Sequence, residues 1–389
     1  MGTMNGILKR WDGSAGYINV ATADVEFDSV LEKVRPWGFY QKRIWLMCNV
    51  CMDAIIGMNM VVMMFGGIQP KYKCLDPEPT TPPVTNGTDN ATRTGSACQA
   101  LFNCVNLEFD EDVKTIVTEF RLYCERAAFS PILTTAQMGG VLFGALFWAQ
   151  MAELFGRRKV LFAIYCQLIL CGLISSFSVS LIMYGALLFL IGCGAGGFWC
   201  VSFVLVQEIV GRKHRLFVTV LNGWPIGVMV FCFIAFLLRD WRKLPLTINL
   251  LGLPMLVCFL WIYESPRWLL QHRRYHEAER TLDLIGQTNG RRAPSIQHLI
   301  SLIEASRSCD DELCRSATGD KKYNYRHLFR TRKLTQHILA LLFSWFTVSF
   351  VSYGFTFSVQ HLPGDRYFNG FLMALLNGCF IWSLLLLDK

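Results

Sequence analysis

The sequence predicts an all-α polytopic membrane protein, and three observations lead to that prediction. Hydrophobic residues make up 53% of the 389 residues and charged residues only 17%, below the roughly 25% of a typical soluble domain. The apolar residues gather in long runs of about 20 residues, the length that a helix needs to cross a bilayer. Two polar motifs lie between these runs: Gly156-Arg157-Arg158-Lys159, and the stretch ESPRWLL that begins at Glu264.

Eight runs qualify as spans, and the last is the weakest because Asn369, Asn377 and Ser383 interrupt it. We expect the spans at residues 44–66, 132–151, 160–178, 181–206, 216–238, 245–263, 335–358 and 369–387. They divide the chain into a polar amino-terminal segment (1–43), a six-span unit with a long loop at 69–130 (44–263), a linker with amphipathic helices (264–334) and a final pair of spans (335–389).

The formal net charge of +8 indicates membrane topology rather than a nucleic-acid partner, because the basic residues are unevenly placed. They gather in the amino-terminal segment, in the loops at 157–159 and 212–215, and in the linker. Loops rich in Lys and Arg stay on the cytoplasmic side. All four segments share that side if the amino terminus is cytoplasmic, which is the topology we predict. The basic residues at 239–243 are an exception, although Asp240 lies among them.

The long loop at 69–130 would then lie outside the cell. It contains two N-glycosylation sequons, at Asn86 and Asn90. It also contains an even number of cysteines, which favours disulfides in an oxidising compartment and leaves three pairings open. These cysteines are Cys74, Cys98, Cys104 and Cys124.

The order of six spans, a long linker and further spans resembles the layout of the major facilitator superfamily. The loop between spans two and three also resembles that superfamily's signature, G-x-L-x-D-R-x-G-R-R. Gly156-Arg157-Arg158 matches the signature and Glu153 replaces its Asp, whereas Ala149 and Leu154 depart from it.

Within the superfamily, the chain resembles the transporters of organic cations, anions and zwitterions from about Phe27 to Leu376. Sugar porters rank second, because they share the E-S-P-R motif but lack the long outer loop. The stretches that carry the resemblance are the outer loop, Thr118–Cys124 (T-E-F-x-L-x-C), Glu208–Arg215 (E-x-V-G-x-x-x-R), ESPRWLL with Glu277-Ala278 and Asn289-Gly290, and Trp345-Phe346 with Tyr353-Gly354.

The resemblance implies a twelve-span architecture in two six-span halves, so this chain would hold the amino-terminal half and an incomplete second half. It implies movement of small organic ions, with cations favoured, across the plasma membrane by alternating access and without a bound cofactor. A different hypothesis is that the chain does not transport. It would then be a fragment, or a regulatory form that pairs with a full-length relative.

The resemblance also implies a cytoplasmic gate. We expect Glu153 to pair with an Arg at the base of span four, and Glu208 to pair with Arg212 or Arg215 at helical spacing. The alternative is that these charges only set topology or form ordinary interfacial ion pairs. The predicted gating residues are Glu153, Gly156, Arg157, Arg158, Glu208, Arg212 and Arg215, with Glu264 and Arg267 holding the linker.

Substrate contacts would come from Asn59, Trp199, Phe203 and Tyr353. Trp199 and Phe203 share a helix face, and an aromatic face attracts organic cations. The alternative is that these aromatics only pack or face lipid.

Asp53 is the one acidic residue well inside a span, where such residues are costly and often functional. Asp53 and Asn59 are six positions apart, which puts them about 120° apart on a helix. If Asn59 faces the cavity, we expect Asp53 to face a neighbouring helix, with Asn49 as a hydrogen-bonding partner, and both a functional and a structural role stay open.

Metal and enzyme chemistry find little support. The Met-rich stretch at 58–64 contains no histidine, so we interpret it as adaptable packing. Cys309 and Cys314 flank an acidic run but have no further ligands nearby. The sequence contains nothing that resembles a nucleophile triad, a phosphate loop or a metal cluster, and we predict neither an enzyme nor a metal site.

Overall fold

The computed structural model describes residues 27–68, 72–74, 107–109, 113–122, 126–292, 295–301, 303–304, 332–358 and 362–387. The predicted glycosylation sites Asn86 and Asn90 lie outside these residues, as do Cys98, Cys104 and Cys124. Within the outer loop the structure describes a two-stranded antiparallel sheet of β1 (Tyr72–Cys74) and β2 (Leu107–Phe109), and the short helix α7 (Ile116–Glu119).

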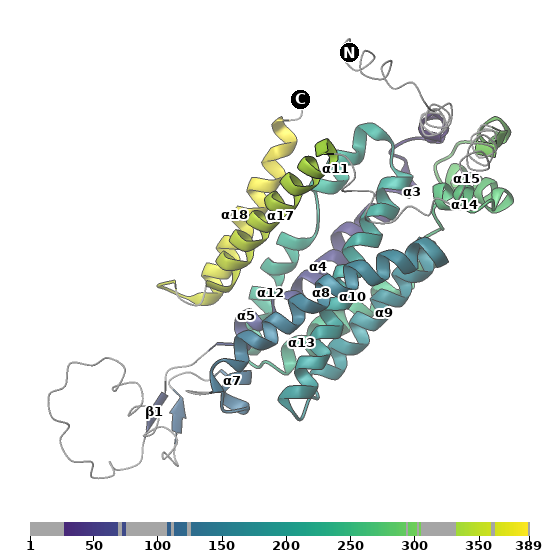
Figure 1. Cartoon of the computed structure of the whole chain (residues 1–389). Helices are drawn as coiled ribbons and strands as arrows, with labels where there is room; N and C mark the ends of the chain where they lie inside the picture. The colour runs from purple at the N-terminus through teal and green to yellow at the C-terminus, as the bar shows by residue number, and fades with distance from the viewer. Residues whose placement is uncertain are drawn as a thin grey trace, which may run out of the picture.

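The described part of the chain contains seven helices long and apolar enough to cross a membrane, which confirms an all-α membrane fold (Figure 1). The eighth predicted span coincides with α18 (Arg366–Leu387), which is a continuous helix but not one of the seven. The seven are Phe39–Gly66, α8 (Phe129–Phe155), α9 (Arg157–Ser175), α10 (Leu181–Ile209), Arg212–Leu238, Lys243–Trp261 and Arg332–Thr356, which lies in α17 (Arg332–Ser358).

Three of these spans are built from consecutive helical pieces. Span one comprises α3 (Phe39–Trp45), the π-helical η1 (Leu46–Met52), α4 (Asp53–Met60) and α5 (Val62–Gly66). Span five comprises η3 (Arg212–His214), α11 (Arg215–Val220) and α12 (Trp224–Leu238). Span six comprises α13 (Lys243–Gly252) and the 3-10 helix η4 (Leu253–Trp261).

The backbones of spans one and five lie in direct contact. A Cβ atom on Gly223 would collide with the carbonyl oxygen of Val50, and one on Gly227 would collide with Ala54. Gly223 also donates its N–H to the Asn49 carbonyl at 2.7 Å. Small residues permit this kind of helix contact in membranes. Glycines allow the same close backbone contact between α8 and α10. They are Gly140, Gly144, Gly192 and Gly196.

A second, smaller hydrophobic core lies at one end of the bundle. The linker helices α14 (Pro266–Gln271) and α15 (Tyr275–Thr288) pack there against a helix at residues 27–33. Asn289 fastens this cap to span one, because its side chain accepts from the Tyr40 N–H at 2.9 Å and donates to the Val34 carbonyl at 3.1 Å. Figure 1 shows α3, α14 and α15 at the end of the molecule opposite β1.

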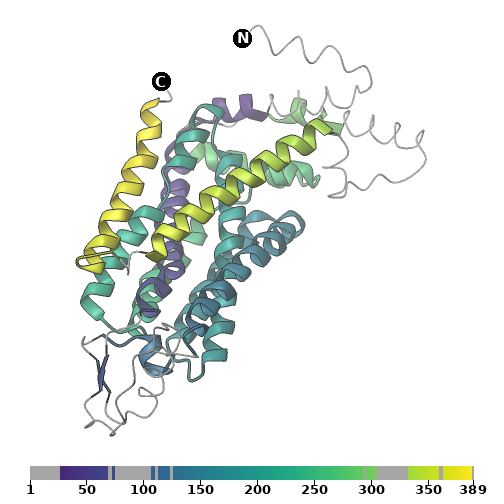
Figure 2. The same cartoon turned by 60° about the vertical axis from the view of Figure 1, so that its left-hand side comes forward.

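Figure 1 shows α17 and α18 beside α12 at the edge of the six-span unit, and in Figure 2 α18 lies at the edge while α17 crosses in front of the bundle. The exposed side chains of α17 include Phe343, Trp345 and Phe350, which are 71–73% exposed. This span therefore contributes little to the packed core that the first six spans form.

Two of the basic residues at 239–243, which were the exception to the charge pattern, form ion pairs at the end of the bundle near β1. Arg242 forms an ion pair with Glu119, at the end of α7 (Ile116–Glu119), and donates to the carbonyls of Ser176 and Ser178 at 2.8 Å each. Trp241 donates its indole N–H to the same carboxylate at 2.7 Å. These contacts tie α7 to the loop before span six and lower the pKa of Glu119 below its usual range.

This pairing predicts an acid-sensitive contribution to stability. A lowered carboxyl pKa means that the contribution is present above the unfolded pKa of about 4.3 and is lost as pH falls through the lower folded value. Glu119→Gln should lower the free energy of unfolding by about 1 kcal/mol or less at neutral pH. The difference in melting temperature between the two proteins in detergent should shrink between pH 6 and pH 3. A difference that stays constant over that range would contradict the assignment.

Candidate functional site

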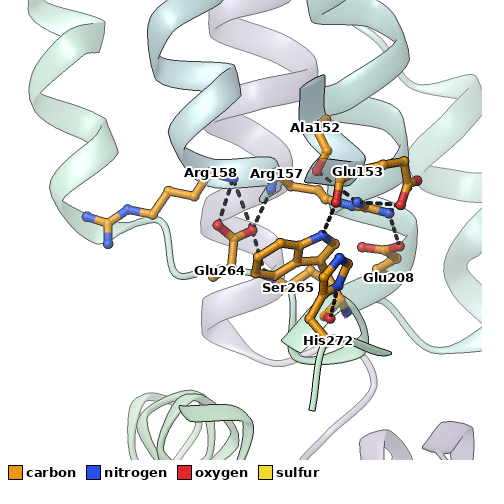
Figure 3. Close-up of polar contacts among 9 residues, drawn as sticks. Ala152, Glu153, Arg157, Arg158, Glu208, Glu264, Ser265 and His272 are labelled. Atoms are coloured by element: carbon orange, nitrogen blue, oxygen red, sulfur yellow. Dashed lines mark hydrogen bonds and ion pairs between the residues drawn. The ribbon is translucent and has the colours of Figure 1, made fainter. Parts of the chain in front are cut away.

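The first polar cluster lies where span two meets span three (Figure 3). Gly156 joins α8 to α9 with a φ of 100°, a left-handed conformation that glycine adopts without strain. The Glu264 carboxylate then accepts from the backbone N–H groups of Arg157, at 2.7 Å, and Arg158, at 3.1 Å. These groups at a helix N-terminus lack intrahelical partners and attract a negative charge. The ESPRWLL motif thus caps the helix that the Gly-Arg-Arg motif begins.

Arg157 is the centre of this cluster and is only 3% exposed. Its guanidinium donates to the Glu153 carboxylate at 2.8 Å, to the Ala152 carbonyl at 2.9 Å and to the Glu208 carboxylate at 3.4 Å. Trp268 adds a further bond, because its indole N–H donates to the Glu153 carbonyl at 2.9 Å. One buried cation therefore joins spans two, three and four, and the linker helix α14 closes the group.

Two of the predicted ion pairs were wrong. Glu153 pairs with Arg157 on the next helix rather than with an Arg at the base of span four. Glu208 also pairs with Arg157, because α10 ends at Ile209 in extended backbone and the helical spacing does not continue to Arg212.

The two arginines of the loop between spans four and five bind the amino-terminal helix instead. The Asp28 carboxylate accepts from Arg212 at 2.5 Å and from Arg215 at 2.8 Å. The guanidinium of Arg267 lies 5.9 Å from the ring of Phe27 in the same cap. Asp28 lies 184 residues from Arg212 and was not predicted as its partner.

The second polar cluster lies inside the bundle, at the end of the π-helical segment. Asp53 is 5% exposed, and its carboxylate accepts from the Trp199 indole N–H at 2.8 Å and from the Gly223 backbone N–H at 3.0 Å. It forms no ion pair with any residue in the described ranges. Asp53 thus faces neighbouring helices. The predicted Asn49 partner was wrong, since Asn49 donates to the Val218 carbonyl at 3.0 Å.

Three aromatic rings continue from this carboxylate. The Trp199 and Trp224 ring centroids lie 5.6 Å apart, and Trp224 and Tyr353 lie 6.4 Å apart, both edge-to-face. Trp199, Phe203 and Tyr353 are each partly exposed. Trp224 was not predicted, although the Gly-Trp-Pro sequence at the start of α12 marks a close helix approach.

Asn59 does not join this aromatic group. It is 2% exposed and exchanges amide hydrogen bonds with Asn249 of span six, at 3.0 and 3.3 Å. Gln137 of span two donates to the Asn59 backbone carbonyl at 3.1 Å. The structure therefore places Asn59 in a joint between spans one, two and six, on a different face from Asp53.

A pocket of about 200 Å³ adjoins the aromatic group. It lies between spans one, five, seven and eight. Its lining is Met64, Trp224, Pro225, Val228, Val351, Ser352, Phe355, Thr356, Gly370, Met373, Ala374 and Asn377. Within the described residues, no group of three or more His, Cys, Asp or Glu side chains is placed to hold a metal ion.

Comparison with known proteins identifies the class. The family model for "Sugar (and other) transporter" matches residues 102–359. The chain therefore belongs to this family, and its fold is that of the major facilitator superfamily. Two structures of the E. coli xylose transporter XylE share the fold: the partially occluded inward-open form (TM-score 0.56, covering 90% of this chain and 74% of XylE) and the form bound to 6-bromo-6-deoxy-D-glucose (TM-score 0.58, covering 88% and 68%), each 14% identical.

Curated relatives confirm the resemblance to organic-ion transporters. Mouse solute carrier family 22 member 4 is 27% identical over 90% of this chain and 69% of its own length. Bovine solute carrier family 22 member 7 is 33% identical over 65% and 45%, respectively. Human organic cation/carnitine transporter 2 is 30% identical over 69% and 48%. The chain thus spans about half the length of most of these relatives.

The helix cap provided by Glu264 can be tested by stability. Glu264→Ala leaves two N–H groups at the start of α9 without their acceptor, so the free energy of unfolding should fall by about 1–2 kcal/mol. The measurement is thermal unfolding in detergent, with Glu279→Ala, an exposed carboxylate on α15, as the control. Equal melting temperatures for the two variants would contradict the capping role.

Proposed function

We propose that the protein moves small organic ions, with cations favoured, across the plasma membrane by alternating access. The observation that supports this most directly is Asp53, a buried carboxylate whose described partners are both neutral N–H donors. A buried charge without a counter-ion is costly in a membrane and often marks a substrate or ion pathway. We propose no bound cofactor and no enzymatic activity.

The aromatic group beside Asp53 supports a cationic substrate. The rings of Trp199, Trp224 and Tyr353 offer faces that attract an ammonium or guanidinium group, and the carboxylate supplies the opposite charge. Trp199 contacts both parts, since its N–H binds Asp53 while its ring packs against Trp224. We propose Trp199, Phe203 and Tyr353 as substrate contacts, with Trp224 and Asp53 added from the geometry. The relative named an organic cation/carnitine transporter agrees with this choice.

We propose that the Arg157 cluster is the rigid base of the cytoplasmic gate, which means that its contacts persist while the gate opens and closes. Its described contacts lie within the first six spans and the linker, so they would keep that unit intact while the halves of the transporter rock. Glu153, Gly156, Arg158 and Glu208 belong to this base. Arg212, Arg215 and Arg267 would fasten it to the amino-terminal helix.

We propose a cytoplasmic amino terminus. The helix at 27–33, the Arg157 cluster, the loop at 212–215 and the linker helices gather at one end of the bundle. Positively charged loops remain inside. At the other end, Arg242 is neutralised by Glu119 and Lys243 lies 3.8 Å from Asp240.

A sugar-porter-like substrate is the second candidate, on the strength of the XylE fold. A sugar requires several hydrogen-bonding side chains. The amides of Asn59 and Asn249 bind each other, which leaves them poorly placed for that role. A chain that only pairs with a full-length relative is a further hypothesis, which an uptake assay distinguishes.

Uptake by cells that express the 389-residue chain tests the proposal. We expect saturable uptake of a labelled quaternary ammonium ion, blocked by excess unlabelled compound, with an aromatic carboxylate and carnitine measured in parallel. Surface biotinylation is the control. Absence of uptake while the chain is at the surface would overturn transport by this chain and favour the pairing hypothesis.

Asp53→Asn tests the charge at the site. It preserves size and one acceptor but removes the negative charge, so cation uptake should fall about tenfold or more, equivalent to at least ~1.4 kcal/mol. Uptake of an uncharged or anionic compound should change much less. Equal losses for all substrates would indicate a structural role for Asp53, and unchanged cation uptake would contradict the proposal.

Trp199→Ala and Trp199→Phe separate the two contacts of this indole. The Ala variant removes the ring and should raise the apparent substrate constant or abolish uptake at normal surface expression. The Phe variant retains an aromatic face but loses the bond to Asp53, so its defect should be smaller. Normal uptake by the Ala variant would contradict a substrate contact.

A further inference from the structure

A pocket of about 420 Å³ lies between spans three and six and the linker, outside the transport path proposed above. Figure 3 shows the side chain of Arg158 pointing away from the Arg157 cluster while its backbone N–H faces Glu264. The pocket therefore lies beside the cluster and shares Arg158 and Glu264 with it. Its lining is Arg158, Lys159, Phe162, Leu256, Phe259, Leu260, Glu264, Leu269, Arg274 and Glu277.

One side of the pocket is apolar and faces the membrane. Phe162 on α9 is 45% exposed and Leu260 on η4 is 70% exposed, although both lie in transmembrane spans. Phe259 and Leu269 are buried behind them, at 4% and 1% exposure. The pocket thus continues into the lipid-facing surface of spans three and six, where an acyl chain would lie.

The other side of the pocket is basic. Lys159 is exposed and makes no ion pair with any described residue. Arg158 directs one guanidinium nitrogen to the Phe259 carbonyl at 3.2 Å, which uses only part of its five N–H donors. Arg274 is 43% exposed at its side chain and contributes the third cation.

Two carboxylates line the pocket, and both are already engaged. Glu264 accepts from the backbone of Arg157, Arg158 and Ser265. Glu277 accepts two bonds from Arg274, at 2.8 and 2.5 Å. An anion that enters the pocket would therefore meet the unpaired Lys159 and the remaining donors of Arg158.

We propose that this pocket binds the headgroup of an anionic phospholipid of the cytoplasmic leaflet. The phosphate would lie among Arg158, Lys159 and Arg274, and an acyl chain would cover Phe162 and Leu260. A soluble phosphate would satisfy the basic side but leave the apolar side empty, so the lipid fits both. The assignment of the leaflet rests on the cytoplasmic amino terminus proposed above.

Such a lipid would join two parts of the protein. Arg158 and Lys159 belong to span three, whereas Arg274 immediately precedes the linker helix α15. A phosphate between them would fasten the linker to the bundle beside the Glu264 cap.

The test is binding of defined lipids to the purified 389-residue chain, by native mass spectrometry in detergent. The probes are phosphatidylserine, phosphatidylcholine and the soluble headgroup glycerophosphoserine. The test variant is Lys159→Gln with Arg274→Gln. The matched control is Lys213→Gln with Arg291→Gln, which removes two exposed positive charges at the same end of the molecule but outside the pocket.

We expect phosphatidylserine to bind the wild-type and control proteins more tightly than phosphatidylcholine. The test variant should bind phosphatidylserine about 30-fold more weakly, which corresponds to about 1 kcal/mol for each basic residue near a membrane surface. The charge-conserving variant, Lys159→Arg with Arg274→Lys, should restore binding. Melting temperatures of all variants check that each one is folded.

Three results would overturn the proposal. Equal losses in the test and control variants would indicate a general effect of surface charge. Unchanged phosphatidylserine binding by the test variant would show that the lipid does not bind in this pocket. Competition by glycerophosphoserine at the same concentration as the lipid would identify a site for a soluble anion. Lipid binding is measured without substrate, so a failure of the transport proposal leaves this result unaffected.

Discussion

The contacts of one buried cation, Arg157, hold together the end of the bundle on which the linker rests. A guanidinium at 3% exposure is tolerable only if most of its donors find partners, and Glu153, Ala152 and Glu208 bind its two terminal nitrogens. Because these partners come from spans two and four, the requirement to satisfy one charge fixes three helices relative to each other. Glu264 then binds the start of the same helix, so the linker is positioned by the same interaction.

Inside the bundle, polar side chains fall into two kinds. Asn59 and Asn249 satisfy each other, and Gln137 adds a bond to the Asn59 backbone, so the three form a closed joint between spans. Asp53 instead receives only neutral donors, from Trp199 and Gly223. A neutral amide pair loses little in a low-dielectric interior, whereas a carboxylate there still favours a positive partner. This difference separates a structural joint from a candidate binding site, although both lie in span one.

The sequence predicted the spans and the clustering of basic loops well, because apolar length and charge are properties of a short stretch of chain. The sequence did not predict contacts between residues that lie far apart in the chain. The i, i+4 pairing of Glu208 with Arg212 assumed a helix that in fact ends at Ile209. Asp28, the actual partner of Arg212, has no local feature that identifies it. Trp224 was missed for the same reason, since its role depends on rings from spans four and seven.

The basic residues at the two ends of the bundle differ in how far they are neutralised, and these contacts explain the difference. At the β1 end, Arg242 is held by a carboxylate and two carbonyls, so a basic residue there contributes little net field. At the linker end, Arg157 is neutralised inside the bundle while Lys159 stays exposed at its surface. The unpaired charge of Lys159 therefore lies where anionic lipid headgroups lie in the proposed topology. The motif that fixes the buried cluster also leaves a cation free for the membrane, because Arg157 turns inward and the next two residues turn outward around the helix.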